Sequence, residues 1–197
     1  MQMRKKIIIS ITSVIFLITL FLIFMSTVGL KTSKFNYLIY EKLKELNSDI
    51  TLELNDVFFK ISLPQKKIII KTDRSKIGIE KNIIDIKNIT VRSELYSFLN
   101  NKNIVSDINI NSEENSIKEV TNFLNSYELN ISRFILFNQI KKGNIKFEIN
   151  IIPDKSKINN VKFNVAGSIN NALINILNKS ELKKTKLNFS FSNNHLN

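Results

Sequence analysis

The chain has 197 residues, no cysteine and a single histidine, and its 29 basic against 17 acidic residues give a formal net charge of +12. Without cysteine the chain has neither a disulfide framework nor a thiolate metal site. A charge this positive raises nucleic acid as a partner, but the lysines are spread along the chain and form no basic block with interleaved aromatic residues. We therefore expect no nucleic-acid partner. Anionic lipid head groups are the expected counter-charge, and a solvated lysine-rich surface is the alternative.

Residues 7–30 contain no charged side chain and only Ser and Thr as polar interruptions. A helix of that length is about 36 Å long, enough to cross a hydrocarbon core of about 30 Å. We predict a transmembrane helix preceded by a basic tail, residues 1–6. Because Arg4, Lys5 and Lys6 lie in this tail, the positive-inside rule places it in the cytoplasm and the rest of the chain across the membrane. The alternative is a cleaved signal peptide, although the apolar run is long and no clear cleavage site comes after it.

The next segment, residues 31–48, is predicted to hold a juxtamembrane amphipathic helix. From Ser33 to Leu46 the apolar residues recur at helical spacing, with lysine and glutamate between them. Such a helix lies on the bilayer or packs on the next part of the chain. Residues 49–197 then form the predicted main domain, of a size that supports a core of its own.

In this domain the hydrophobic period changes to two. Apolar and polar residues alternate through the predicted strands, which are Ile50–Leu54, Val57–Leu63, Lys67–Thr72, Ile77–Ile79, Ile83–Val91, Ile104–Ile110, Ile131–Phe137, Ile145–Ile151, Ile158–Val165 and Leu187–Phe191. Polar groups at 73–76 and 141–144 predict turns. We therefore predict a mainly β (α+β) domain: a curved antiparallel meander sheet that forms an open groove, with a few short helices.

Three helical segments interrupt the predicted strands. Ser93–Asn100 places Leu and Phe on one helical face, and Asn171–Leu177 is predicted to form a helical turn. Ser116 and Glu119 fit the capping-box pattern ahead of an apolar periodic run, which predicts a helix from Ser116 to Asn125.

No constellation of residues supports catalysis. His195 stands alone in a polar tail, Glu113 and Glu114 precede a predicted helix as solvated charges, and none of the four glycines belongs to a phosphate-binding loop. We expect a protein that is not an enzyme and that binds no cofactor or metal.

The apolar face of the predicted sheet must be buried by helices, by closure into a sandwich or by an external apolar ligand. An open face would bind lipid acyl chains, whereas a closed sandwich would hold an ordinary core. The lipid-facing candidates are the inward-alternating residues Val57, Phe59, Ile61, Leu63, Ile145, Phe147, Ile149, Ile151, Phe163 and Phe189.

The order of these segments resembles the N-terminal part of the AsmA-like family (AsmA, TamB and YhdP types). The resemblance rests on the basic start, the apolar helix, the segment YLIYEKLKELN, the strands DITLELNDVFFKISLPQKKIIIK, the unit IDIKNITVRSELYSFLNNKNIVSDINI and the hairpin KKGNIKFEINIIPDKSKINNVKFNVAGSI. It implies an anchor in the bacterial inner membrane and a periplasmic groove that handles phospholipid during lipid transport or outer-membrane biogenesis. Family members stack many more strands, so this chain would not cross the cell envelope alone.

Two other hypotheses remain open. The final strand, Leu187–Phe191, alternates aromatic residues and has no closing element after it, so its edge would pair with an envelope protein. The chain would then be a non-catalytic structural or assembly protein. A third hypothesis is a truncated remnant of a longer protein.

Overall fold

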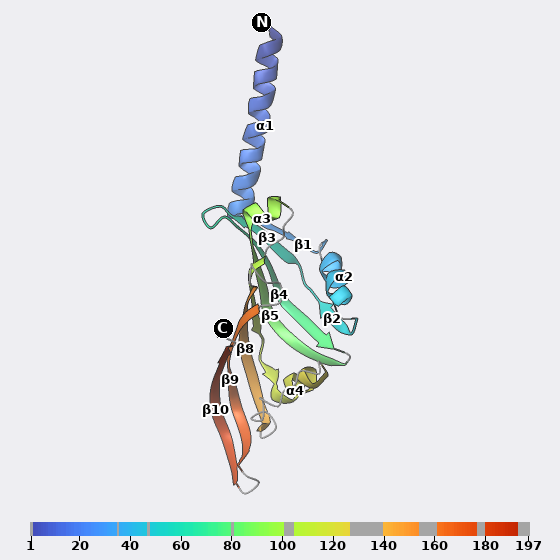
Figure 1. Ribbon diagram of the computed structural model, residues 1–197, viewed down its shortest axis with the longest axis vertical. Coiled ribbons are helices and arrows are strands. Elements are labelled where there is room, and N and C mark those ends of the chain that lie inside the picture. Colours follow the sequence, from blue (N-terminus) through green and yellow to red (C-terminus); the bar gives the residue numbers. More distant parts are fainter. Residues whose placement is uncertain are drawn as a thin grey trace.

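The computed structural model describes residues 2–34, 36–46, 48–79, 81–100, 105–126, 140–153, 161–176 and 180–192. An N-terminal apolar helix leads into a mostly β domain that contains one antiparallel sheet and three further helices (Figure 1). The helices are α1 (Gln2–Thr27), α2 (Asn36–Leu46), α3 (Leu95–Leu99) and α4 (Ile117–Ser126). The strands are β1 (Leu30–Thr32), β2 (Ile50–Glu53), β3 (Val57–Ser62), β4 (Lys67–Ile79), β5 (Asn82–Glu94), β6 (Val105–Ser112), β7 (Asn115–Ser116), β8 (Ile140–Pro153), β9 (Val161–Ile176) and β10 (Ser180–Ser192).

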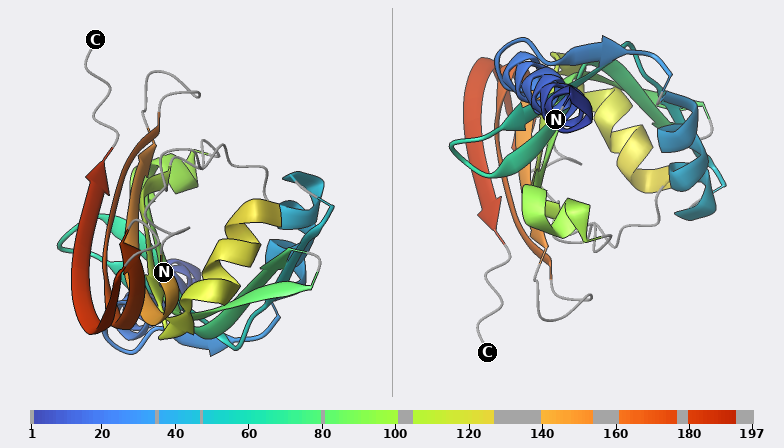
Figure 2. Two further views of the ribbon diagram at one scale, coloured as in Figure 1. Left: turned by 90° about the horizontal axis from the view of Figure 1, so that it is seen from below. Right: turned by 90° about the horizontal axis from the view of Figure 1, so that it is seen from above.

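The ten strands form one sheet that does not close on itself. The strand order is β1-β3-β4-β5-β6-β8-β9-β10, with β2 paired to β4 and β7 paired to β8. All pairs are antiparallel, and the sheet curves around α4 (Figure 2). We call the face that carries α4 the inner face and the opposite face the outer face. The predicted fold class, an apolar N-terminal helix followed by an open, mainly β domain, is confirmed.

The apolar run does not stay helical to its predicted end. Helix α1 ends at Thr27, and the chain turns at Gly29, whose φ of 75° suits a residue without a Cβ. Leu30 already belongs to strand β1, which pairs with β3. Among the described residues α1 is the one helix long and apolar enough to span a membrane. The amphipathic helix predicted within residues 31–48 is present as α2.

The polar group at 73–76, predicted as a turn, is a kink inside one long strand. Arg74 has a φ of 51°, and the pairing of β4 with β5 continues on both sides of it, through Asp73 and Ser75. Asp73 and Arg74 are both exposed, so two successive side chains leave the inner face before Ser75 returns to it. The buried hydroxyl groups of Thr72 and Ser75 share a hydrogen bond (2.8 Å) across the kink.

Two other local predictions are wrong for the same reason, since strand pairing overrides the local pattern. Residues 171–176, expected to form a helical turn, continue β9, where Ala172 is fully buried between paired strands. The turn expected at 141–144 lies within β8, where Gly143 has a φ of 148° and the pairing with β9 shifts register. The predicted strand Ile131–Phe137 lies outside the described residues.

Helix α4 begins where its capping box predicts. The backbone N–H of Glu119 donates to Oγ of Ser116 (3.1 Å), and the N–H of Ser116 donates to the Glu119 carboxylate (3.0 Å). The helix packs its apolar side against β5 and β8 and completes a buried cluster. That cluster consists of Ile84, Ile86, Ile117, Val120, Ile140, Ile145, Ile169 and Ala172.

Candidate functional site

The inner face carries continuous rows of apolar side chains because the strand registers align them. One row, which we call the central row, joins six neighbouring strands through directly paired residues. Its members are Phe59, Ile70, Val91, Ile108, Ile151 and Phe163. All six side chains are half-buried. At about 4.8 Å per strand the row is about 24 Å long.

The central row begins next to the apolar helix α1. Leu30, three residues after the end of α1, pairs with Phe59 at one end of the row. The C-terminal end of α1 and the first residue of the central row therefore lie close together at one end of the domain (Figure 1).

A second row lies one step farther from α1 along the strands. Its members are Val57, Thr72, Ile89, Ile110, Ile149, Val165 and Phe191. Val57 and Thr72 are buried, Phe191 is exposed, and the others are half-buried. The Phe191 ring lies 5.7 Å from the ring of Phe163, which ties the second row to the central row at its far end.

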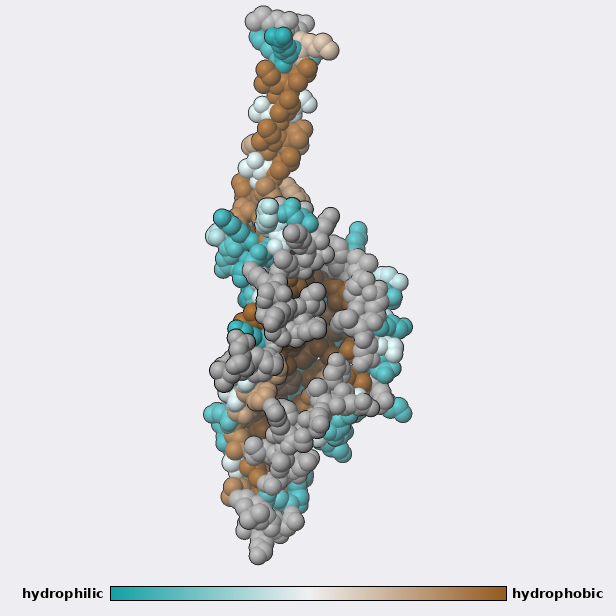
Figure 3. Space-filling view, viewed as in Figure 1, coloured by the Kyte–Doolittle hydropathy of each residue, from teal (hydrophilic) through white to brown (hydrophobic). Residues whose placement is uncertain are grey.

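The inner face is divided into two parts with different cover. Below the kink, α4 fills the concavity between β5 and β8 and buries the core cluster. Above the kink, most side chains of the two rows are only half-buried, the exceptions being buried Val57 and Thr72 and exposed Phe191. Figure 3 shows a hollow in the middle of the domain that is lined by hydrophobic residues. The upper part of the inner face is therefore the candidate site.

The structure brings nine of the ten predicted lipid-facing residues onto the inner face. Phe59, Ile151 and Phe163 lie in the central row, and Val57 and Ile149 lie in the second row. Val57 and Ile145 are buried, with 1% and 2% of their surfaces exposed, and so belong to the core.

The remaining predicted residues are more scattered. Ile61 pairs with buried Ile68 beyond the central row, on the side of α3. Phe147 and Phe189 flank Gly167 and pack against the α4 cluster. Leu63 lies in the turn between β3 and β4, not on the sheet face, and is 43% exposed.

Sequence reasoning misses half of the central row. Ile70, Val91 and Ile108 lie in predicted strands but are not among the lipid-facing candidates. Their alternation with Lys71, Thr90 and Asn109 is visible in the sequence, but it does not reveal which strands are neighbours. Only the register shows that these side chains form one surface with Ile151 and Phe163.

The outer face is polar, as the alternation predicts. The side-chain amide of Asn109 donates to Glu148 and Asn150 of β8. The side-chain amide of Asn111 donates to Asn88 of β5. Nearer to α1, Arg92 and Lys67 both pair with Asp107. A depression of about 420 Å³ there is lined by Lys67, Glu94, Ser106, Asp107, Asn150 and Ile152. The apolar and polar surfaces thus lie on opposite sides of one sheet.

The described residues contain no group of three or more His, Cys, Asp or Glu that would hold a metal ion. The two rows contain apolar side chains and Thr72 only, so this surface offers contact area and no acid, base or nucleophile pair. His195 lies outside the described residues. In comparisons with known proteins, no family model, no curated protein and no solved structure matches the chain.

Proposed function

We propose that this protein is a membrane-anchored, non-catalytic carrier or binding protein that holds phospholipid acyl chains against the upper inner face of its sheet. The observation that carries the proposal is the central row: six half-buried apolar side chains on an unclosed sheet, beginning beside α1. Covering these side chains with an acyl chain removes their apolar surface from water, which is favourable by about 25 cal/mol per Å² of buried area.

The dimensions of the row suit an acyl chain. A chain that reaches the bilayer midplane is about 15 Å long, half of the hydrocarbon core. The central row is about 24 Å long, and the second row lies about 7 Å from it. An acyl chain laid along the rows would contact successive strands without displacing α4.

The proposed location is the bacterial inner membrane, with α1 as a single-pass anchor. The basic residues at its start favour a cytoplasmic N-terminus and a periplasmic β domain. In that compartment the protein would contribute to lipid transport or outer-membrane assembly, as the AsmA-like resemblance implies.

The test introduces a carboxylate on the inner face of strand β8 in one variant and on its outer face in another. The full-length protein is reconstituted in phospholipid vesicles that contain a lipid with a photoreactive acyl chain, and cross-linked peptides are mapped by mass spectrometry. Adducts are expected on β4, β6 and β8. Ile151→Asp should abolish these adducts, because a carboxylate in the row repels the chain.

The matched control is Ile152→Asp. Ile152 is the next residue of β8, faces outward and is 52% exposed, so the same substitution should leave the adducts unchanged. Cooperative unfolding of both variants shows that each is folded. Adducts confined to α1 in the wild-type protein would reject the proposal.

The second candidate is an assembly protein that acts through the free end of the sheet. It is favoured by the position of β10, a strand of 13 residues that ends the strand order and pairs with β9 alone among the described strands. A photoreactive amino acid at position 188, near the middle of this edge, should give one discrete protein adduct in cells. Position 146, exposed on the interior strand β8, should give none.

A further inference from the structure

We propose that the end of the β domain next to α1 docks onto the bilayer through a surface formed by the β3–β4 turn and α3. This docking surface comprises Leu63, Pro64, Gln65 and Lys66 of the turn and Tyr96 of α3. Its occupant is the surface of the membrane that α1 enters, with anionic phospholipid head groups. The inference requires α1 to span the membrane and is independent of lipid binding by the inner face.

The junction between α1 and the sheet fixes the orientation of the domain. Met25, in the last turn of α1, is only 4% exposed, and α1 contacts β3. A Cβ at Gly29 would lie 2.6 Å from the ring of Phe58, so backbone and ring are in close contact there. The membrane helix is thus packed against the domain and does not end in a free linker.

Strand β3 carries the turn back toward the membrane. Chain direction in β1 leads away from α1, and β3 is antiparallel to β1, so β3 runs toward α1. Leu63 lies four residues after Phe59, the partner of Leu30, which places it up to about 13 Å farther in that direction. Figure 1 shows this turn and α3 flanking the base of α1 at the same end of the domain.

The turn and α3 are joined through the backbone at the end of the domain next to α1. The backbone N–H of Leu95 donates to the carbonyl oxygen of Lys66 (2.9 Å), which joins the start of α3 to the turn. Leu63 is 43% exposed and Tyr96 is 77% exposed, although both have large apolar side chains. In the view along α1 in Figure 2, the two elements lie on different sides of the helix, so they would support the domain at separate points.

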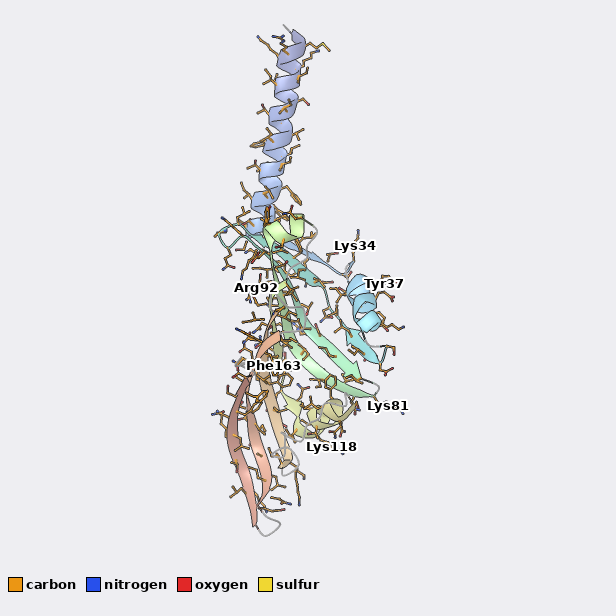
Figure 4. The ribbon with its side chains drawn as sticks, in the orientation of Figure 1. Lys34, Tyr37, Lys81, Arg92, Lys118 and Phe163 are labelled. Atoms are coloured by element: carbon orange, nitrogen blue, oxygen red, sulfur yellow. The ribbon has the colours of Figure 1, made fainter. Side chains whose placement is uncertain are left out.

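The chemistry of this surface matches a membrane interface. Leucine enters the hydrocarbon boundary, tyrosine prefers the head-group level, and lysine extends its charge to lipid phosphates. Lys66 is exposed at this end, and Lys34 also lies near it (Figure 4), whereas Lys31 is paired with Asp56 (3.3 Å). Exposed lysines at this end are attracted to an anionic lipid surface.

The chain has no cysteine, so single substitutions allow unambiguous labelling. Leu63→Cys and Tyr96→Cys are each labelled with an environment-sensitive fluorophore in the full-length protein. The labelled proteins are reconstituted in vesicles of phosphatidylethanolamine and phosphatidylglycerol that contain nitroxide-labelled lipid. Both probes should be quenched by the nitroxide and shifted to shorter emission wavelengths. Adding Lys66→Glu to either should reduce the quenching.

The matched control is Ile83→Cys. Ile83 is 46% exposed, close to the exposure of Leu63, but lies at the start of β5, at the turn far from α1. Its probe should show the quenching of a probe in water. Ile15→Cys, in the middle of α1, should be quenched most strongly and reports insertion of the helix.

Quenching at Ile15 without quenching at Leu63 and Tyr96 would overturn the docking surface and leave the anchor intact. If the probes at Ile15, Leu63 and Tyr96 are all unquenched, the docking surface and the membrane anchor are both overturned. Equal quenching at Leu63 and Ile83 would also reject the proposal, because it would show that the whole domain lies on the membrane without preference for this end.

Discussion

Ser112 shows how a single hydroxyl group maintains the sheet where its pairing changes. This residue ends β6 and is completely buried, and its Oγ accepts the backbone N–H of Phe147 on β8 at 2.8 Å. The β5–β6 register also shifts at this level, between Ile86 and Asn88. The Ser112 hydroxyl group therefore accepts a hydrogen bond that a backbone carbonyl would otherwise accept, at the level where the β5–β6 register shifts.

We predict that Ser112→Ala destabilises the domain by about 1–3 kcal/mol, because the buried N–H of Phe147 loses its acceptor. The measurement is urea denaturation of the full-length protein in detergent micelles. Ser190→Ala, at an exposed position of β10, should change the free energy of unfolding by less than about 0.5 kcal/mol. Equal effects of the two substitutions would contradict this role of the hydroxyl group.

The sequence predicts the faces of single residues well where alternation is regular, and fails at the kink. Four polar residues at 73–76 fit a turn as well as a bulge, since both place successive side chains in water. A bulge forms instead of a turn when the segments on both sides of these residues stay paired with the same neighbouring strand, here β5. That pairing depends on Ile86 and Ile89 of β5, which are too far along the chain for local pattern to reveal.

At the scale of elements, helix α4 is predictable because its signals are local. The capping box and the apolar spacing lie within ten residues, and the structure uses both. Residues 171–176 show the opposite case. Their apolar residues fit one helical face, but they lie between β8 and β10, and both backbone edges are paired in the sheet. Non-local hydrogen bonding outweighs the weak helical preference.

We predict that Ser116→Ala lowers the stability of the domain by about 1 kcal/mol, because the N–H of Glu119 at the start of α4 loses its cap. Lys118→Ala, an exposed substitution in the same helix, is the control (Figure 4). Thermal unfolding followed by circular dichroism compares the two. If only the lysine variant loses stability, the capping interaction is not important for the domain.

For the molecule as a whole, the sequence predicts the two faces of the sheet but not the order and register of its strands. Period-two alternation predicts one apolar and one polar face, and both are found. The candidate rows, however, are made by seven strands whose order and register no single segment specifies. The same holds for the α1 junction, where Gly29 and Phe58 meet although they are far apart in the sequence.

We predict that Gly29→Ala loosens the attachment of the domain to α1. A methyl group there would collide with the Phe58 ring, and alanine disfavours the φ of 75°. In the labelled proteins, lipid quenching at position 63 should decrease while quenching at position 15 stays unchanged. Val28→Ala, an exposed position next to it, should alter neither. Unchanged quenching in the glycine variant would show that the junction does not orient the domain.

The direction of β10 restricts the symmetry of any assembly built on it. This strand runs from the far end of the domain back toward the end that carries α1 (Figure 1). Two copies paired antiparallel through β10 would be related by a twofold axis perpendicular to the strands, which points their α1 helices in opposite directions. A twofold axis along the strands would point both α1 helices in the same direction, but it would place the inner face of one copy beside the outer face of the other. A continuous apolar surface across this edge, with both partners oriented the same way, therefore requires a strand from a different protein.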